Sequence, residues 1–251
     1  MRELMQTPVR TLVALWRLLR ATLHVLHGML VMTRFPALDA AGRHERIRWW
    51  SAGLVRAMGL TIQVSGTPRP GATLIVANHI SWLDIAAIHA AAPHARFVSK
   101  ADVLSWPLLG WLIRNAGTLF IERERKRDAV RVVHAVAEAL KAGDTVAVFP
   151  EGTTSSGAEL LPFHANLLQA AVVTATPVQP VVLRFFDARQ AFSPAVAFVG
   201  DTSLARSLWT VACGEGLGVR VLLLPPMGTE HADRRLLAEH LRQVMLERLA
   251  D

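Results

Sequence analysis

The sequence predicts an α/β protein with a central mixed sheet flanked by helices, preceded by an N-terminal pair of amphipathic helices. Two observations support this fold class. After Gly59, short β-rich runs alternate with longer helical stretches, an alternation typical of a sheet covered by helices. Before that point the chain shows helical periodicity and a different charge balance. A length of 251 residues suits one full core with an appended segment, so we expect units at residues 1–60 and 61–251.

The N-terminal unit is set apart by its charge. Residues 1–60 hold nine arginines, no lysine and three acidic side chains, a net charge of +6, whereas residues 61–251 hold 18 basic and 17 acidic side chains, a net charge of +1. A nucleic-acid enzyme normally carries its basic surface on the folded core, so this distribution argues against nucleic acid as a partner. A basic segment that is also apolar points instead to an anionic lipid bilayer.

The geometry of the first predicted helix favours a position in the membrane interface. At 100° per residue its basic side chains fall within one arc of about 120°, and leucines fill most of the remainder. The longest stretch free of Lys, Arg, Asp and Glu, Ala21–Thr33, is too short to span a bilayer comfortably. We therefore expect an amphipathic helix lying in the interface, although a core-packed helix with a solvated stripe gives the same pattern. The basic arc comprises Arg10, Arg17, Arg20, His24, His27 and Arg34.

A second N-terminal helix should run through Arg46–Trp50, which pairs arginine with tryptophan as interfacial anchors do, and reach about Met58. In the α/β region, strands are expected at Thr61–Val64, Thr73–Ala77, Arg96–Ser99, Thr118–Ile121, Thr145–Phe149, Val178–Phe186, Ala195–Val199 and Val219–Leu224. Helices are expected near 82–91, 104–114, 126–141, 162–174, 203–213 and 231–249. The single cysteine, Cys213, excludes an internal disulfide, and without a zinc-type Cys/His cluster no metal is expected.

His79 and Asp84 are the first candidate for chemistry, because an imidazole and a carboxylate can act as a general base and the group that orients it. Residues five apart on one regular helix point about 140° away from each other, so the pair can meet only across a turn. The strand expected at Thr73–Ala77 places His79 just before a helix that carries Asp84, with Ser81 as a cap. Standing alone, the pair could equally be a polar contact that closes a helix N-terminus.

A second stretch, Gly117–Arg123, is a strand that ends in an arginine and could present its guanidinium to a phosphate. An ordinary strand followed by the charged first turn of a helix would give the same sequence pattern without any phosphate site. A third stretch, Val148–Ser155, is an apolar strand that stops at a proline and continues with Glu151, Gly152 and hydroxyl side chains beginning at Thr153. Glycine lets backbone amides approach a ligand closely and hydroxyls can donate to oxygen atoms, although a polar turn is the plain alternative.

Together these three stretches resemble the 1-acylglycerol-3-phosphate (lysophospholipid) acyltransferase family. The family's His-x4-Asp motif matches His79 and Asp84, its phosphate-binding strand matches Gly117–Arg123, and its Phe-Pro-Glu-Gly-Thr motif matches Phe149–Thr153. A fourth motif, a β-branched run around a proline, resembles Val178–Val182, and order and spacing agree over roughly residues 45–200. The resemblance implies a membrane-binding helical pair before an α/β core, and Arg123, Glu151, Gly152 and Thr153 as acceptor-binding residues.

The resemblance implies transfer of an acyl chain from a thioester to a lysophospholipid hydroxyl, with 1-acylglycerol-3-phosphate as acceptor and phosphatidic acid as product. His79 would take the hydroxyl proton while Asp84 fixes its tautomer and stabilises the imidazolium. No cofactor is expected, because the donor is itself a substrate, acyl-CoA or acyl carrier protein. The basic N-terminal segment suits the cytoplasmic face of the inner (plasma) membrane.

One departure leaves the acceptor head group open. After its third motif the family usually has phenylalanine, a basic residue and glycine, whereas here Phe163 is followed by His164 and Ala165. Lyso-ornithine lipid or another lysolipid is therefore an alternative acceptor. A membrane-binding scaffold without activity and a thioester hydrolase are further alternatives, but a scaffold has no need of a base. The apolar run Val103–Leu112 could line an acyl tunnel or simply pack in the core.

Overall fold

The computed structural model describes residues 8–100, 119–121 and 127–250. Within these residues, seven strands form one sheet in the order β1-β7-β6-β2-β5-β3-β4. Neighbours run parallel except β6 and β7, which are antiparallel, so the predicted mixed sheet is confirmed. The strands are β1 (Thr61–Ser65), β2 (Thr73–Ala77), β3 (Ala95–Lys100), β4 (Leu119–Ile121), β5 (Thr145–Val148), β6 (Val178–Phe186) and β7 (Gly218–Leu223).

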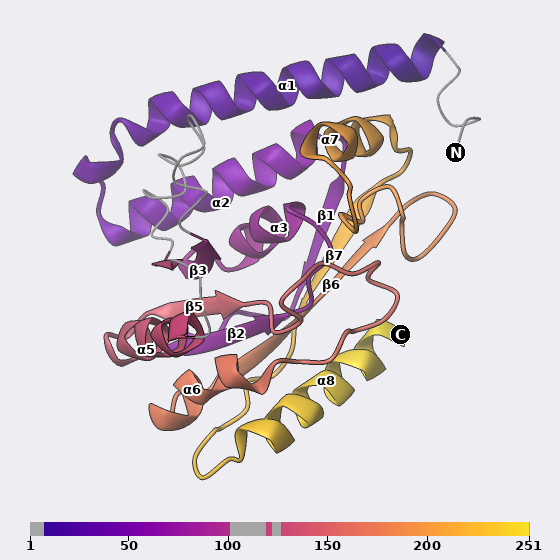
Figure 1. Cartoon of the computed structure of the whole chain (residues 1–251). Helices are drawn as coiled ribbons and strands as arrows, with labels where there is room; N and C mark the ends of the chain where they lie inside the picture. Colours follow the sequence, from indigo (N-terminus) through magenta and orange to yellow (C-terminus); the bar gives the residue numbers. More distant parts are fainter. Residues whose placement is uncertain (1–7, 101–118, 122–126, 251) are drawn as a thin grey trace.

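Helices cover both faces of the sheet, as Figure 1 shows. One face carries α1 (Pro8–Met32), α2 (Ala40–Ala57), α3 (Leu83–Ala91) and α7 (Leu204–Cys213); the other carries α5 (Arg127–Lys141), α6 (Gln169–Val173) and α8 (Arg234–Ala250). Successive side chains of a strand point to opposite faces, so β2 contributes Ile75 and Ala77 to the first core and Leu74 and Val76 to the second. The sequence of β2 is continuously apolar and does not alternate, because this strand is buried on both faces of the sheet.

The strand predicted at Ala195–Val199 is wrong. This segment forms turns and irregular structure, because its backbone groups pair with the loops at the end of the sheet. The Phe198 amide donates to Ile80 O at 2.9 Å, and the Thr154 hydroxyl donates to Phe198 O. The segment therefore fastens two loops that follow neighbouring strands, which its apolar sequence did not reveal.

The helix predicted near 162–174 is shorter than expected. A 3-10 turn at Ala165–Leu168 leads into α6, and residues before it are extended. The His164 amide donates to Pro150 O at 2.8 Å, so this stretch is held by the loop after β5 and does not form a helical turn. The helix predicted through Arg46–Trp50 is α2, which begins at Ala40 because Asp39 caps it by accepting from the Gly42 amide at 2.8 Å.

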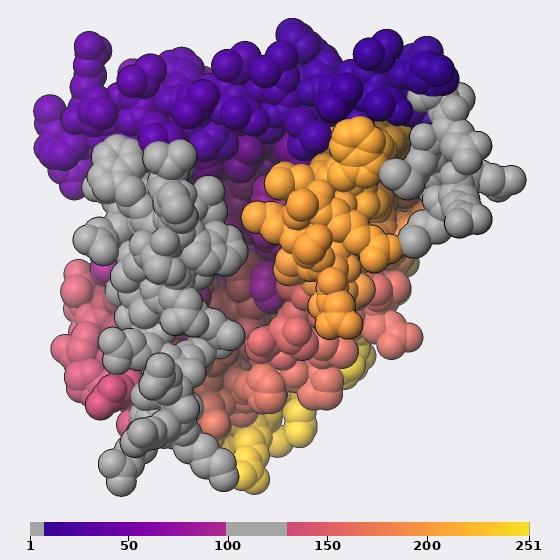
Figure 2. Space-filling model, turned by 45° about the horizontal axis from the view of Figure 1, so that its top comes forward, coloured from indigo at the N-terminus to yellow at the C-terminus, as the bar shows by residue number. Residues whose placement is uncertain are grey.

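The helix α1 crosses α2 and α7 and forms a ridge along one side of the molecule (Figures 1 and 2). It contacts the remainder through small residues one heptad apart, Ala14, Ala21 and Gly28, which are buried. Its exposed apolar side chains are Val9, Leu12, Val13, Leu15, Trp16, Leu19, Leu23, Leu26 and Leu30. Among the described residues, no helix combines the length and apolar character that crossing a bilayer requires.

The basic arc of α1 is turned partly inward. Arg17 donates to Ala212 O and Gly214 O, at 2.9 and 2.6 Å, beside the end of α7, and Arg10 pairs with Glu215 at 2.7 Å. Because α1 and α2 bury side chains in the same core as β2, these two helices pack against the α/β region. The division into units at residue 60 stays a prediction.

Candidate active site

His79 and Asp84 lie in contact where β2 gives way to α3. β2 ends at Ala77, the chain turns through His79 to Trp82, and α3 begins at Leu83, so Asp84 occupies the first turn of the helix. His79 Nδ1 is 2.7 Å from Asp84 Oδ2. The contact that the five-residue spacing predicts across a strand-to-helix turn is therefore present.

Asp84 is fully buried and organises the turn around it. Its Oδ2 also accepts from the Ile80 and Ser81 amides, at 2.7 and 2.9 Å. These two amides precede the helix and have no partner within it, so the carboxylate satisfies them. Burial raises the pKa of Asp84, and the hydrogen bonds from His79, Ser81 and Ile80 oppose that rise. The hydroxyl of the predicted cap, Ser81, accepts only one long hydrogen bond, from the Leu83 amide at 3.4 Å, so the Asp84 carboxylate is the main cap of this turn.

The imidazole of His79 is held on one side and open on the other. It stacks on Phe149 with a centroid distance of 4.1 Å and an interplanar angle of 12°. Because Nδ1 donates to the carboxylate, a neutral ring keeps its lone pair on Nε2, which has no partner among the described residues. With 23% of the side chain exposed, Nε2 can receive a proton from a bound molecule.

Glu151 joins the loops after β2 and β5, which are adjacent parallel strands and so end at one edge of the sheet. Its Oε1 accepts from the His79 amide at 2.7 Å and its Oε2 from the Leu161 amide at 2.9 Å. The residue is 3% exposed, and burial raises the pKa of its carboxyl. Both oxygens of this predicted acceptor-binding residue are therefore engaged with backbone amides, one of them that of the candidate base.

Gly152 and Thr153 lie exposed beside Glu151. Gly152 has φ +71°, in the left-handed region that favours glycine, and a Cβ there would lie 3.0 Å from His164 Cδ2. His164, the residue that departs from the family pattern, is thus brought against the third motif although twelve positions separate it from Gly152. Its exposed side chain is available to a ligand at this edge.

Two supporting residues were missed by sequence reasoning. Asn78 is buried and exchanges two hydrogen bonds with Leu183 of β6, accepting from its amide at 2.7 Å and donating to its carbonyl at 2.9 Å. The Ser155 amide donates to His79 O at 2.8 Å. A polar residue directly after a wholly apolar strand was the available signal for Asn78, whereas nothing in the sequence pairs Ser155 with His79.

Other predicted features lie outside the described residues. These are Arg123, the candidate phosphate ligand, the apolar run Val103–Leu112 and the helix expected near 104–114. The site as described therefore consists of the loops after β2 and β5, the start of α3 and the stretch 160–164.

An α/β sheet that presents an oriented, partly exposed imidazole at its carboxyl edge is an arrangement typical of enzymes, which place working side chains in strand-to-helix turns. Comparison with known proteins gives the family. A family model described as "Acyltransferase" matches residues 61–184, which contain His79, Asp84 and Glu151. The crystal structure of the 1-acyl-sn-glycerophosphate acyltransferase from Thermotoga maritima has the same fold, with a TM-score of 0.73 and 22% identity, and covers 96% of this chain and 95% of that one.

Two relatives are similar over most of their length. The chain is 39% identical to a lyso-ornithine lipid O-acyltransferase from Pseudomonas aeruginosa, over 84% of this chain and 81% of the relative. It is 37% identical to a 1-acyl-sn-glycerol-3-phosphate acyltransferase from Neisseria meningitidis, over 79% of this chain and 78% of the relative. The chain belongs to the lysophospholipid acyltransferase family and is an acyltransferase, as its motifs predict.

Proposed function

We propose that this acyltransferase moves an acyl chain from an acyl thioester to the free hydroxyl of a lysolipid, with 1-acylglycerol-3-phosphate as acceptor and phosphatidic acid as product. The observation that carries the proposal is the 2.7 Å contact between His79 and Asp84, with Nε2 of the same imidazole left open. The two relatives that act on lysolipids supply the acceptor class.

His79 acts as the general base in this proposal. Its Nε2 takes the acceptor's hydroxyl proton as that oxygen attacks the thioester carbonyl, and Asp84 stabilises the imidazolium that forms. The tetrahedral intermediate then expels the thiolate, which takes the proton from His79 Nε2 and leaves as a thiol. An ester bond forms and a thioester bond breaks, so the step balances without a cofactor, and no acyl-enzyme is needed.

The surrounding residues receive proposed roles from their contacts. Glu151 fixes the His79 backbone through its Oε1 and contacts the acceptor only with the lone pairs that remain. Gly152 and Thr153, which are exposed beside it, bind the acceptor. Arg123 lies outside the described residues, and its proposed role as a phosphate ligand comes from the family motif alone. The donor is acyl-CoA or acyl carrier protein, and both deliver the same thioester.

Lyso-ornithine lipid is a second candidate acceptor, favoured by one specific observation. His164 lies against Gly152, where the family usually has another basic residue, and no glycine follows it. The imidazole of a histidine offers a phosphomonoester fewer hydrogen-bond donors than the side chain of lysine or arginine does. An acceptor without a phosphate would lose less from that exchange.

We further propose that the exposed apolar side of α1 rests in the bilayer, at the cytoplasmic face of the membrane. Nine large apolar side chains of this helix are exposed, which is unfavourable in water and favourable in the acyl region of an interface. Small residues on the opposite side seat α1 on the protein. The enzyme would thereby meet an acceptor and release a product that both reside in the membrane.

The test is acyl transfer from labelled acyl-CoA and acyl carrier protein to lysophosphatidic acid, lyso-ornithine lipid and lysophosphatidylethanolamine. The wild type is compared with His79→Ala and with His240→Ala, which removes an exposed histidine of α8. Diacyl product on one acceptor, lost only in His79→Ala, supports the proposal and names the substrate. Free fatty acid without acceptor would indicate a hydrolase. No product from folded, membrane-bound protein would indicate a scaffold.

A further inference from the structure

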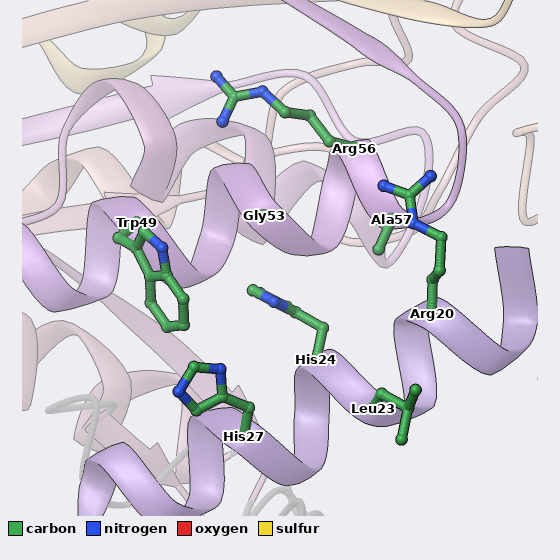
Figure 3. Close-up of a pocket in the computed structure, with 8 residues that line it drawn as sticks. All are labelled: Arg20, Leu23, His24, His27, Trp49, Gly53, Arg56 and Ala57. Carbon is green, nitrogen blue, oxygen red and sulfur yellow. The ribbon is translucent and has the colours of Figure 1, made fainter.

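A groove of about 430 Å³ lies between the two N-terminal helices, and none of its residues belongs to the site around His79. It opens between the middle of α1 and the second half of α2, as Figure 3 shows. Its lining combines two arginines, two histidines and a tryptophan, with no acidic side chain. The lining residues are Arg20, Leu23, His24, His27, Trp49, Gly53, Arg56 and Ala57.

The inner part of the groove is fixed by close packing of the two helices. A Cβ at Gly53 would lie 2.3 Å from His24 Cε1, so glycine at this position allows the imidazole to lie against α2. His24 Nε2 donates to Trp50 O at 2.8 Å, which leaves its Nδ1 free to face a ligand. The ring centroids of His24 and His27 both lie 5.2 Å from that of Trp49. These three rings form a preformed aromatic end of the groove.

The other end of the groove carries unneutralised positive charge. Arg20 of α1 and Arg56 of α2 lie at the Ala57 end, opposite His27 and Trp49 (Figure 3). Both arginines are exposed, and neither has a hydrogen-bond or ion-pair partner among the described residues. Their guanidinium groups point in different directions in Figure 3, so a rotation about side-chain bonds is required before both can bind one anion. Arg10 and Arg17 differ from them, because protein groups already occupy their guanidinium groups.

The groove lies beside the apolar side of α1. Leu23 lines the groove and is 55% exposed, and Leu19 and Leu26, one turn away on either side, are also exposed. If α1 rests in a bilayer, the groove on its flank is at the depth of the lipid phosphates. Guanidinium groups bind phosphate oxygens in a forked geometry, and tryptophan favours this boundary.

We infer that the groove binds the phosphate group of an anionic phospholipid in the bilayer on which α1 lies, with Arg20 and Arg56 as its principal ligands. The inference rests on the proposed membrane contact of α1 and adds a preference for anionic lipid to it. The occupant is a bilayer lipid because the apolar side chains flanking the groove match acyl chains, which free phosphate lacks.

The experiment is sedimentation of the full chain with phosphatidylcholine vesicles, with and without phosphatidylglycerol. Arg20→Gln/Arg56→Gln is compared with Arg34→Gln/Arg46→Gln, which removes two exposed arginines of the same segment outside the groove. The groove variant should lose roughly thirtyfold of the binding that phosphatidylglycerol adds, about fivefold per arginine, and the control much less. Binding to phosphatidylcholine alone should change little in either variant.

Equal losses in the two variants would show diffuse attraction and overturn the inference, as would equal binding of the wild type to both vesicles. A wild type that binds neither vesicle would also refute the proposed membrane contact, which separates the two failures. Sodium phosphate and sodium chloride at matched ionic strength should release the wild type equally. Selective release by phosphate would assign the groove to free phosphate and overturn the choice of a bilayer lipid.

Discussion

Replacing Asp84 by asparagine tests whether the negative charge of the carboxylate stabilises the protonated form of His79 during catalysis. Asparagine fills the same buried space, and its carbonyl oxygen can still accept from the Ile80 and Ser81 amides. In the proposed mechanism, what is lost is the negative charge beside the imidazolium that forms in the transition state. Unit charges about 4 Å apart interact by about 4 kcal/mol at an effective dielectric constant of about 20, which corresponds to roughly 10³-fold in kcat. Loss of the imposed tautomer adds to this, so a fall of roughly 10³ to 10⁴ is expected.

The folding cost of Asp84→Asn should be smaller than its catalytic cost. Burial raises the pKa of this carboxyl, so removing the charge relieves a desolvation penalty. Against that gain, an amide placed at Oδ1, which has no partner among the described residues, buries an unsatisfied donor at about 1–3 kcal/mol. Steady-state acyl transfer and thermal unfolding separate the two costs, with Ser81→Ala as control in the same turn. A folded Asp84→Asn enzyme within tenfold of wild-type kcat would refute the dyad.

Two further predictions concern pH and backbone strain. His89 is buried, and desolvation lowers its pKa to about 4. Between pH 6.5, the ordinary pKa of histidine, and pH 4, this imidazole therefore binds a proton in the unfolded chain but stays neutral in the folded one. The free energy of unfolding should therefore fall as pH drops from about 6.5 to 4, by up to about 3 kcal/mol. Urea unfolding across that range should give a flatter profile for His89→Gln; an unchanged slope would assign the pH dependence to other groups. Gly152→Ala should cost about 1–2 kcal/mol of backbone strain and also lower kcat/KM, because its Cβ would displace His164. Gly200→Ala, at φ +59° with nothing within 4 Å of a Cβ, is its control and should lose stability alone; equal kinetics in the two variants would remove His164 from the site.

Much of the fold could be predicted because local sequence agrees with tertiary placement. The runs at Thr73–Ala77 and Val178–Phe186 are mainly apolar because both strands are central and largely buried on both faces. Ala195–Val199 is similarly apolar but pairs with no strand in the part of the chain that the structure describes. Its backbone instead binds loops distant in sequence, and composition alone does not distinguish these outcomes.

Part of the candidate site could be predicted from local sequence, and part depends on the order of the strands. His79 and Asp84 could be paired from sequence because a five-residue spacing across one turn leaves few geometries. The roles of Glu151 and Asn78 depend on which strands are neighbours: β2 lies between β5 and β6, so the loop after β5 reaches the His79 amide and β6 reaches Asn78. Strand order is a property of the whole chain, which no single motif encodes.

The basic arc of α1 divides between two kinds of neighbour. The sequence predicts that it faces an anionic membrane, and in the structure Arg10 and Arg17 of this arc bind Glu215 and the carbonyls beside α7. A helix pressed between protein and bilayer must satisfy both, and here the heptad of small residues and the inner arginines face the protein while the leucines face outward. If α1 lies on a bilayer as proposed, the charge that faces the lipid belongs to residues on the flank of the helix, of which Arg20 is one. The membrane affinity of this enzyme should accordingly depend more on α1 leucines and Arg20 than on Arg10 or Arg17.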